Sequence, residues 1–392
     1  MRIGLITGEY PPLEGGVGDF TRELARALVD LGHQVMVITG SSIADRIADS
    51  PIRVEPIVPR WTHICWRVIG DAARRLKLDV LNLQYEPAAY AMQIGINLFP
   101  WWYHRQPIHA PVVTTFHDLL VPYLFPKAGA LRWKIVELLA RSSDAVIVTN
   151  EEDRLKLQTS NFKLQSPISN LHLIPIGSNI QPSLPPEFDR DLERARWGAG
   201  KNDWLTAYFG FLNMSKGGLT LLRGVGLLVN DGLPARLLLI GGRTGSSDPT
   251  NARYAGEVDR ALASVGLHDR VQSTGYVDPP QVSAAMAAAD VIALPYADGV
   301  SFRRGSLMAA LAHGKAIVTT QPRAAIPELV DGENCVLVPP EDASALASGV
   351  RRVMTEPGLR LRLEIGAHRL AQRFTWDKIA ARSVEVFRGV TS

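Results

Sequence analysis

The segment Gly299–Thr320 reads GVSFRRGSLMAALAHGKAIVTT and joins a loop with two adjacent arginines to an apolar helix and then a buried strand. A helix that begins near Ser306 directs its free backbone N–H groups and the positive end of its dipole at the preceding loop. Because Arg303 and Arg304 lie in that loop, the segment fits a multiply charged anion such as a diphosphate. An ordinary capped helix with two solvated arginines is the alternative that this segment alone leaves open.

The same succession of strand, loop and helix recurs along the whole chain, in two series. The first series of predicted strands is Ile3–Thr7, Val35–Thr39, Val80–Leu83, Val112–Phe116, Ala145–Thr149 and Leu171–Pro175. The second is Leu205–Gly210, Arg236–Ile240, Val271–Gly275, Val291–Leu294, Ala316–Thr319 and Cys335–Val338. Such alternation is typical of parallel sheets covered by helices on both faces. The predicted fold class is therefore α/β, with two doubly wound Rossmann-like domains that face a cleft.

Length and composition agree with two domains. A chain of 392 residues is too long for one hydrophobic core. We predict an N-terminal domain over 1–180, a C-terminal domain over 201–370, and a proline-bearing, charged linker over 181–200. In open parallel sheets the ligand lies at the carboxyl ends of the strands, so we expect it in the cleft.

Other classes of protein are disfavoured by charge, cysteine content and hydropathy. A net charge of +3 is too weak to indicate a nucleic acid partner. Cys65 and Cys335 lie far apart in the sequence and suggest neither a disulfide framework nor a metal site. The first ten residues, MRIGLITGEY, read as a strand and lack the pattern of a signal peptide, and no apolar run is long enough to span a membrane. We expect a cytoplasmic protein.

The loop after the first predicted strand, GEYPPLEGGVGDF, is rich in glycine. Gly15, Gly16 and Gly18 allow the backbone to approach a ligand closely before the helix predicted over Phe20–Leu31. A dinucleotide-binding loop is disfavoured because this loop is long, contains prolines, and is followed by a second strand without a terminal acidic residue. A purely structural turn remains the alternative.

Taken together, the motifs resemble family 4 of the retaining nucleotide-sugar glycosyltransferases, which have the GT-B fold. The resemblance covers nearly the whole chain and rests on these segments: EYPPLEGGVGDFTRELARALVDLGHQVMVIT, TTFHDL, YFGFLNMSKGG, LLLIGG, GYVDPPQVSAAMAAADVIALPY, SLMAALAHGKAIVTT and IPELVDGENCVLVPPED. It implies an acceptor-binding N-terminal domain and a C-terminal domain that binds the nucleotide-sugar donor. It also implies that the last helix, within 371–392, crosses back to the first domain.

The resemblance also implies roles for individual residues. The catalytic residues would be His117 beside the donor sugar, Asp118 as its neighbour, and Lys216 on the donor diphosphate. The donor-binding residues would be Gly16, Gly210, Lys216, Gly241, Val277, Asp298, Arg303, Arg304, Gly305, Ser306 and Leu307. The acceptor-binding residues would be Tyr10, Gly15, Gln84 and Tyr85. Without the resemblance, His117 reads equally as an interior histidine and Lys216 as a surface lysine.

The chain departs from the family pattern at three positions. Phe211 stands where the family usually has an arginine, and Val300 and Met308 align with two family glutamates. Either Asp298 and the Arg303–Ser306 turn supply the missing contacts, or the protein binds the donor without transferring its sugar. We favour the first, because the turn introduces two cations beside the expected diphosphate.

A metal site is not expected. The pair Asp189 and Asp191 has the D-x-D spacing of metal-dependent sugar transferases, but it lies in the charged linker and reads as a solvated helix turn. Lys216 and the arginines provide the positive charge that a diphosphate needs. We therefore predict no metal and no cofactor, since the nucleotide sugar is a co-substrate, with UDP as the default base and GDP as an alternative.

Aromatic and basic residues crowd the first domain. The aromatic residues are Trp61, Trp66, Trp101, Trp102, Tyr103, Tyr123, Phe125 and Trp133. The interleaved basic residues are Arg60, Arg67, Arg74, Arg75, Lys77, Arg105, Lys127, Arg132 and Lys134. Such a mixture suits a peripheral contact with the inner face of a membrane and a lipid-linked or sugar acceptor, although core tryptophans beside solvated cations are the alternative.

The sequence thus predicts a retaining, metal-independent glycosyltransferase that moves a sugar to a hydroxyl of a glycan, glycolipid or small molecule. The alternatives are a nucleotide-sugar binding module, a nucleotide-sugar epimerase and a phosphorylase of the same fold. A phosphorylase would need a pyridoxal-binding lysine, which no motif marks. The acceptor and the oligomeric state are not predicted.

Overall fold

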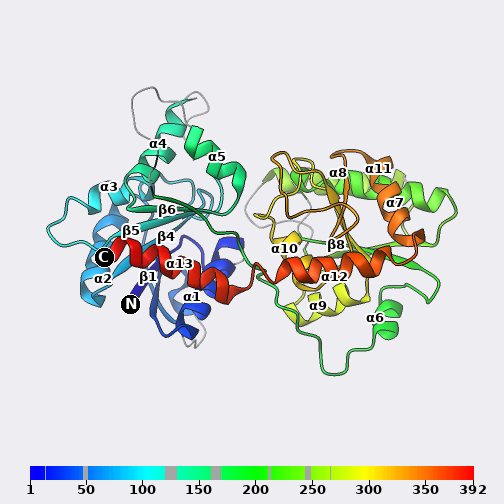
Figure 1. The fold of residues 1–392 in the computed structure, drawn as a ribbon, viewed down its shortest axis with the longest axis horizontal. Coiled ribbons are helices and arrows are strands. Elements are labelled where there is room, and N and C mark those ends of the chain that lie inside the picture. Colours follow the sequence, from blue (N-terminus) through cyan, green and yellow to red (C-terminus); the bar gives the residue numbers. More distant parts are fainter. Residues whose placement is uncertain are drawn as a thin grey trace. The chain divides into compact units, whose positions relative to one another are not determined.

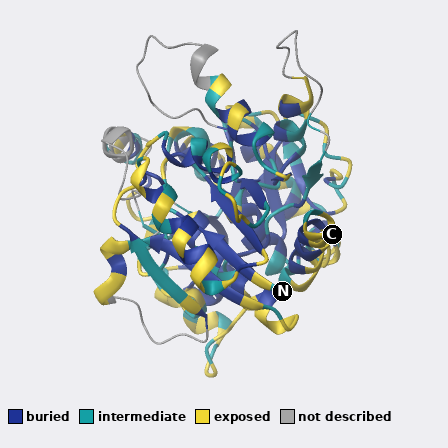
Figure 2. Ribbon diagram, turned by 90° about the vertical axis from the view of Figure 1, so that its left-hand side faces the viewer, coloured by how far each residue is buried: buried dark blue, intermediate teal, exposed yellow. Residues whose placement is uncertain are grey.

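The computed structural model describes residues 1–13, 15–46, 52–119, 130–159, 168, 170–210, 213–242, 249–264 and 266–392. It divides into two compact units, Met1–Asn179 together with Thr375–Ser392, and Ile180–Phe374. Each unit is a parallel sheet packed between helices (Figure 1), which confirms the predicted α/β fold class with two Rossmann-like sheets. Buried residues concentrate on the strands, whereas the outward turns of the helices are exposed (Figure 2).

Among the described residues, the first unit contains a seven-stranded parallel sheet of order β3-β2-β1-β4-β5-β6-β7. Its strands are Arg2–Ile6 (β1), Gln34–Gly40 (β2), Arg53–Val58 (β3), Val80–Tyr85 (β4), Val112–Phe116 (β5), Ala145–Val148 (β6) and Leu171–Leu173 (β7). Its α-helices are Gly16–Asp30 (α1), Ile64–Leu76 (α2), Phe99–Tyr103 (α3), Ala130–Arg141 (α4), Glu151–Thr159 (α5) and Trp376–Thr391 (α13). Strands β1, β4 and β5 are neighbours, so their carboxyl ends share one edge.

The two faces of this sheet bury different helices. Val35 and Val37 of β2 pack in a cluster with α1 and α13, whereas the alternate residues Met36 and Ile38 pack in a cluster with α2, α3 and α4. This alternation follows from the two-residue period of a strand. A strand covered on both faces is apolar throughout, which explains the continuous hydrophobic runs in the sequence.

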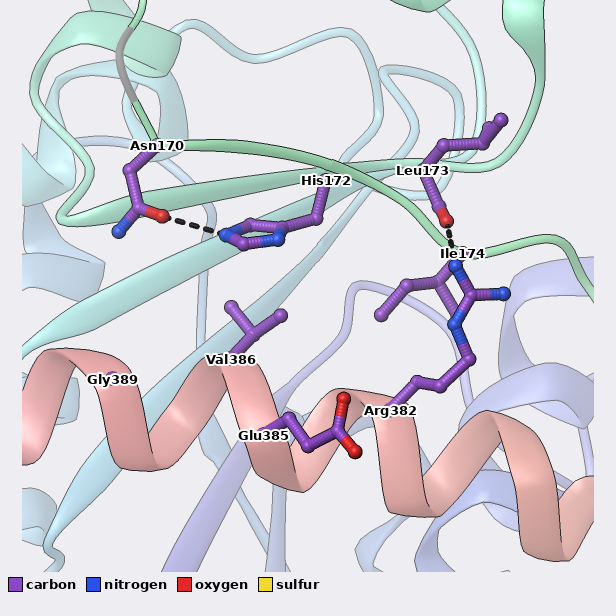
Figure 3. Close-up of a pocket in the computed structure, with 8 residues that line it drawn as sticks. All are labelled: Asn170, His172, Leu173, Ile174, Arg382, Glu385, Val386 and Gly389. Atoms are coloured by element: carbon purple, nitrogen blue, oxygen red, sulfur yellow. Dashed lines mark hydrogen bonds between the residues drawn. The ribbon is translucent and has the colours of Figure 1, made fainter.

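The C-terminal helix α13 completes the core of the first unit, beside α1 (Figure 1). Trp376 at its start donates from Nε1 to the Ser178 carbonyl over 2.8 Å, and Phe387 near its end is fully buried. Where α13 passes β7, Arg382 donates to the Leu173 carbonyl over 2.5 Å. A cavity of about 260 Å³ lies between them, lined also by Asn170 and His172 (Figure 3).

Strand β3 was absent from the sequence prediction. Its sequence, RVEPIV, carries the charged residues Arg53 and Glu55 and contains Pro56, which cannot donate a ladder hydrogen bond. The structure places it at the edge of the sheet, beside β2. An edge strand needs only one bonded side, so it tolerates the proline.

The second unit contains, in its described part, a six-stranded parallel sheet of order β10-β9-β8-β11-β12-β13. Its strands are Trp204–Phe209 (β8), Ala235–Ile240 (β9), Val271–Gly275 (β10), Val291–Leu294 (β11), Ile317–Thr320 (β12) and Val336–Val338 (β13). Its α-helices are Arg190–Arg196 (α6), Gly218–Asn230 (α7), Pro249–Ser264 (α8), Pro279–Ala288 (α9), Gly305–Ala312 (α10), Ala343–Thr355 (α11) and Leu359–Ala371 (α12). The buried Asp290 carboxylate pairs with Arg190, Arg194 and Arg360, which joins α6 and α12 to β11.

Candidate active site

At the carboxyl end of β8, a glycine and a lysine lie against each other. Gly210 has a φ of +120°, and a Cβ added to it would lie 3.2 Å from Lys216 Nζ. Lys216 ends a short 3₁₀ turn, Met214–Lys216, and its own amide donates to the Asn213 side chain over 3.0 Å, which caps the turn. Burial and the charge of Arg304 lower the pKa of Lys216 to about 8. The lysine is thus a partly desolvated cation beside the backbone of Gly210.

The turn before α10 brings two arginines onto one carboxylate. Asp298 pairs with Arg304, and its other oxygen lies 3.5 Å from an Arg303 nitrogen. The Arg304 guanidinium also lies 5.0 Å from the centre of the Tyr296 ring, whose hydroxyl is 2.7 Å from Ser306 Oγ. Asp298 therefore holds the two cations in place, while a second anion can use their remaining donors.

Two polar atoms in this turn are buried without a partner. Arg304 Nε and Ser301 Oγ have no hydrogen-bond partner within the described residues. A buried polar atom without a partner costs free energy, so a ligand with acceptor oxygens near this turn would be favoured. The sequence pattern did not identify Ser301.

The other predicted donor-binding residues of the second unit lie at three places. Gly241 follows β9, and a Cβ added to it would lie 3.7 Å from Gly210, so both glycines share the edge with Lys216. Gly305 and Ser306 begin α10 as predicted, but the Leu307 side chain is fully buried and leaves only its backbone near the turn. Val277 follows β10, two strands from β8, and therefore lies farther along the edge.

The three departures from the family pattern have different outcomes. Val300 and Met308 are both buried in the core of the second unit, each 2% exposed. Their side chains pack inside the unit and do not offer a surface to a ligand. Phe211 lies outside the described residues.

In the first unit, His117 follows β5 and contacts residues of two neighbouring elements. Its Nε2 lies 2.9 Å from Gln84 Oε1 at the end of β4, and its ring packs edge-on against Phe20 of α1 with centroids 4.6 Å apart. Burial lowers the pKa of His117 to about 3, so the imidazole is neutral at physiological pH. Asp118 follows it directly at the same strand end.

The remaining predicted acceptor-binding residues are more buried than the sequence suggested. Tyr85 is fully buried and its hydroxyl accepts a hydrogen bond from Asn97 over 2.7 Å, and Tyr10 is also in the core. Gln84 is fully buried as well, and its amide bonds to His117. Side-chain contacts of the two tyrosines are thus already used within the unit.

The glycine-rich loop is organised by an acidic residue that the sequence analysis did not single out. The Glu9 carboxylate accepts from the backbone N–H groups of Val17 over 3.0 Å and Gly18 over 3.2 Å. A Cβ at Gly15 would lie 2.1 Å from that carboxylate, whereas a Cβ at Gly16 would meet nothing within 4 Å. Helix α1 therefore starts earlier than predicted, at Gly16, because Glu9 caps its first amides.

Glu86, at the end of β4, is a second acidic residue that the motifs did not mark. Burial, Asp118 and Glu9 together raise the pKa of Glu86 to about 8. The group is therefore largely protonated at neutral pH and can donate a hydrogen bond. Its position beside Gln84 and Tyr85, at a strand end, is the signal that could have identified it.

Comparison with known families accounts for both units. Residues 15–177 match the model described as "Glycosyl transferase 4-like domain", and residues 205–356 match "Glycosyl transferases group 1". The two matches follow one another along the chain and contain the strand ends described above. The chain belongs to family 4 of the glycosyltransferases.

Relatives of this glycosyltransferase match along its whole length. It is 27% identical to the D-inositol 3-phosphate glycosyltransferase of Xylanimonas cellulosilytica over 432 residues, which covers 100% of this chain and 97% of that protein. It is 23% identical to the phosphatidyl-myo-inositol mannosyltransferase of Mycolicibacterium smegmatis, which covers 100% of this chain and 94% of that protein. The predicted family and the enzyme class are confirmed.

Solved structures show the same fold. Sucrose-phosphate synthase from Thermosynechococcus elongatus aligns with a TM-score of 0.76 at 21% identity, over 99% of this chain and 98% of that one. HepE from Anabaena, solved with UDP and glucose, aligns with a TM-score of 0.75 at 18% identity, over 99% of this chain and 100% of that one. The GT-B architecture of the glycosyltransferase is thereby confirmed.

The linker carboxylates of the glycosyltransferase have structural roles. Asp189 caps α6 by accepting from the Leu192 amide over 2.9 Å, and Asp191 lies in the first turn of that helix, as the sequence predicted. No group of three His, Cys, Asp or Glu side chains suited to a metal ion occurs within the described ranges.

The aromatic residues of the first unit of the glycosyltransferase are mainly internal. Trp61 and Tyr103 are buried, and Trp66, Trp102 and Trp133 pack against the core. Tyr123, Phe125 and Lys127 lie outside the described residues, as does the Arg132 side chain. Trp101 is exposed on α3 and stacks with Arg105, whose guanidinium is 4.0 Å from the ring centre. In the part of the chain that the structure describes, no helix combines the length and hydropathy needed to cross a membrane.

Proposed function

We propose that this glycosyltransferase moves a sugar from a nucleoside-diphosphate sugar to an acceptor hydroxyl, with retention of configuration and without a metal ion. The observation that carries the proposal is the convergence of Lys216, Arg304 and Gly210 at adjoining strand ends of the second unit. Arg304 Nε is buried there without a partner among the described residues, which indicates a site for a polar ligand. A diphosphate supplies the acceptor oxygens that these donors need.

The cations would act on the leaving group. When the bond between sugar and diphosphate breaks, negative charge develops on the departing oxygen, and fixed cations stabilise that charge. Lys216, Arg303 and Arg304 provide this charge from the protein itself. We therefore expect sugar transfer to continue at an unchanged rate in the presence of EDTA, and an activity that EDTA abolishes and Mg²⁺ or Mn²⁺ restores would contradict the proposal.

Retention follows in this proposal from attack on the same face that the diphosphate leaves. The acceptor hydroxyl would lose its proton to the departing phosphate, so that no covalent sugar–enzyme intermediate forms. Glu86, at the end of β4, has a pKa raised to about 8, and its protonated form is a poor nucleophile. NMR analysis of the first product formed would distinguish a retained from an inverted anomeric centre.

The relatives guide the choice of substrates. HepE has been solved with UDP-glucose, and the relatives above are named for acceptors that contain inositol. We infer a UDP- or GDP-sugar donor and a polyhydroxylated acceptor, either a small sugar or cyclitol or its lipid-linked form. The half-buried carboxyl groups of Glu9 and Glu86 provide hydrogen-bonding groups suited to hydroxyls at the acceptor side.

The deciding experiment is a panel of UDP-, GDP-, ADP- and TDP-sugars tested without added metal. Thermal shift would report donor binding, and nucleoside diphosphate release with mixed sugar and lipid acceptors would report transfer. A donor that both stabilises the protein and yields its diphosphate supports transfer. Stabilisation without release supports the nucleotide-sugar binding module, which the buried Val300 and Met308 would suit, and conversion of the sugar without release supports an epimerase.

A peripheral membrane contact would place a lipid-linked acceptor near the first unit. Ile64 of α2, Trp101 of α3 and Ile108 are exposed, and the neighbouring Arg67 and Arg105 are exposed cations. Such a surface suits the cytoplasmic face of an anionic membrane. Flotation with anionic liposomes tests this, with Trp101→Ala as the variant and neutral liposomes as the control. Absence of binding at low salt would remove the membrane contact from the proposal.

A further inference from the structure

A chain of buried amide groups runs from the middle of the first sheet to His117. Asn82 and Gln84 are neighbours on one face of β4, and both are fully buried in a strand that is otherwise apolar. Asn82 Nδ2 donates to the Val113 carbonyl over 3.1 Å and to Thr115 Oγ1 over 3.0 Å. Gln84 Nε2 donates to Asn82 Oδ1, and Gln84 Oε1 lies 2.9 Å from His117 Nε2. Burying two amide side chains in a hydrophobic core costs free energy unless their hydrogen bonds are satisfied. Their presence therefore points to a function beyond packing.

The hydrogen bonds that link these amide groups to His117 can run in only one direction. A backbone carbonyl can only accept, so the Asn82 atom beside the Val113 carbonyl must be the amide nitrogen. Asn82 Oδ1 is then an acceptor and requires the nitrogen of Gln84 as its donor. Gln84 therefore presents its oxygen to His117, and a neutral imidazole can satisfy that oxygen only with a hydrogen on Nε2.

We propose that Asn82 and Gln84 are positioning residues that fix His117 as the Nε2–H tautomer and so present its Nδ1 as a hydrogen-bond acceptor for a substrate hydroxyl. Among the described residues, no hydrogen-bond partner of Nδ1 is found. Phe20 contacts the ring edge-on and restricts its rotation. The inference rests on the proposed function only for the identity of the hydroxyl, which belongs to the donor sugar or the acceptor.

The low basicity of the His117 imidazole limits Nδ1 to accepting a hydrogen bond. Because burial lowers the pKa of His117 to about 3, Nδ1 is a weak base and accepts a hydrogen bond without taking the proton. His117 then orients a hydroxyl and does not act as general base. This agrees with a mechanism in which the leaving phosphate receives the proton.

The tautomer can be observed directly by ¹⁵N NMR of the full-length protein labelled at histidine. We expect the His117 nitrogens to show a protonated Nε2 and an unprotonated Nδ1, and His117→Asn assigns the signals. A His117 that carries its proton on Nδ1 would overturn the inference. This measurement needs no turnover, so it decides the tautomer even if every donor in the panel fails and the proposed function falls.

Two substitutions at Gln84 distinguish positioning from packing. Gln84→Glu in its protonated form keeps both the donor to Asn82 Oδ1 and the acceptor for Nε2–H, whereas Gln84→Met keeps the volume but offers neither donor nor acceptor. We expect Gln84→Glu to retain the tautomer and most of kcat, and Gln84→Met to mix the tautomers and lower kcat about tenfold, the effect of roughly one hydrogen bond. UDP binding should be unchanged in both, since its proposed contacts lie in the second unit.

A purely structural role predicts the opposite order, because a buried glutamate disturbs a core more than a methionine does. Equal kcat in Gln84→Met and wild type would therefore overturn the inference. The matched control is Asn170→Met, since Asn170 Oδ1 lies 2.6 Å from His172 Nε2 at the cavity beside α13 (Figure 3). That variant should alter the His172 signals and leave kcat unchanged. If Gln84→Met does not fold, the wild-type spectrum and Gln84→Glu still decide.

Discussion

At the scale of single residues, Lys216 is the most direct test of the donor site. Lys216→Gln removes a cation from the end of β8 while keeping a polar side chain of similar length. Because a hydrogen bond to a charged group contributes about 1.5–3 kcal/mol, we expect the dissociation constant of the donor to rise about 10- to 150-fold. Titration calorimetry measures this. Lys201→Gln, at a lysine whose side chain is 87% exposed, is the control and should leave affinity unchanged.

The depressed pKa of Lys216 predicts a pH dependence with a definite sign. With a pKa of about 8, Lys216 is charged below pH 8 and loses its proton as the pH rises through that value. Donor affinity should be constant from pH 6 to 7.5 and fall about tenfold for each pH unit well above 8. Lys216→Arg should flatten the profile because a guanidinium stays protonated. A decline on the acid side alone would show that another group controls binding.

The sequence predicted where the candidate residues lie in the fold better than it predicted their environment. His117, Lys216 and Arg304 were predicted by motif, and the structure places each at a strand end or helix start. Glu9 and Glu86 were not, because their raised pKa values depend on burial and on carboxylates distant in the sequence. The tyrosines Tyr10 and Tyr85 were predicted to bind an acceptor, but their burial depends on packing that no local pattern reveals.

At the scale of elements, the two arginines of the turn that precedes α10 differ in burial, and we expect them to contribute differently to donor binding. The Arg304 side chain is 14% exposed and that of Arg303 is 25% exposed, and Arg304 also stacks on Tyr296. We expect Arg304→Ala to weaken donor binding at least tenfold and Arg303→Ala to weaken it less. Asp298→Asn should weaken binding to an intermediate extent because both guanidinium groups lose their anchor. If neither arginine variant changes affinity or turnover, the two cations do not compensate for the missing family residues.

Helix α13 makes a prediction about stability that is independent of catalysis. Phe387 is fully buried between α13 and the sheet of the first unit. Its replacement by alanine leaves a cavity, and such substitutions cost about 3–5 kcal/mol of unfolding free energy. Urea denaturation would measure the loss. Leu361→Ala on α12, at a side chain 61% exposed, should change the unfolding free energy by less than about 0.5 kcal/mol. A small effect of Phe387→Ala would show that α13 is not part of the cooperative core.

Strands that are buried on both faces could be predicted from the sequence, whereas the edge strand β3 could not. Strands such as β2 and β11 are buried and appear in the sequence as apolar runs, so their positions could be predicted. Strand β3 has charges and a proline because only one of its sides is bonded, and its signal is correspondingly weak. Helix α1 began earlier than predicted because its cap is a side chain from outside the helix.

At the scale of the whole molecule, the cations proposed for the donor diphosphate and the proposed acceptor contacts belong to different units, while Gly16, also predicted to bind the donor, lies in the first unit. The turn Met214–Lys216 and the start of α10 lie in the second unit, and the ends of β4 and β5 lie in the first. This division follows from the β–α alternation of the sequence, because each series of strands builds its own sheet and its own row of carboxyl ends. It predicts that a nucleotide without a sugar is held mainly by the cations of the second unit, whereas protection at Gly16 as well would show that the glycine-rich loop shares the diphosphate.

Hydrogen exchange measured by mass spectrometry tests that prediction. We expect UDP, or GDP if the panel selects it, to slow exchange at Met214–Gly217 and at Gly305–Met308, because bound phosphates order these amides. Exchange at the strand ends around Gln84 and His117 should remain unchanged until a complete nucleotide sugar or an acceptor is added. Lys216→Gln should abolish the protection at nucleotide concentrations that saturate the wild type. Protection confined to the first unit would instead assign nucleotide binding to the glycine-rich loop and refute the donor site proposed at β8 and α10.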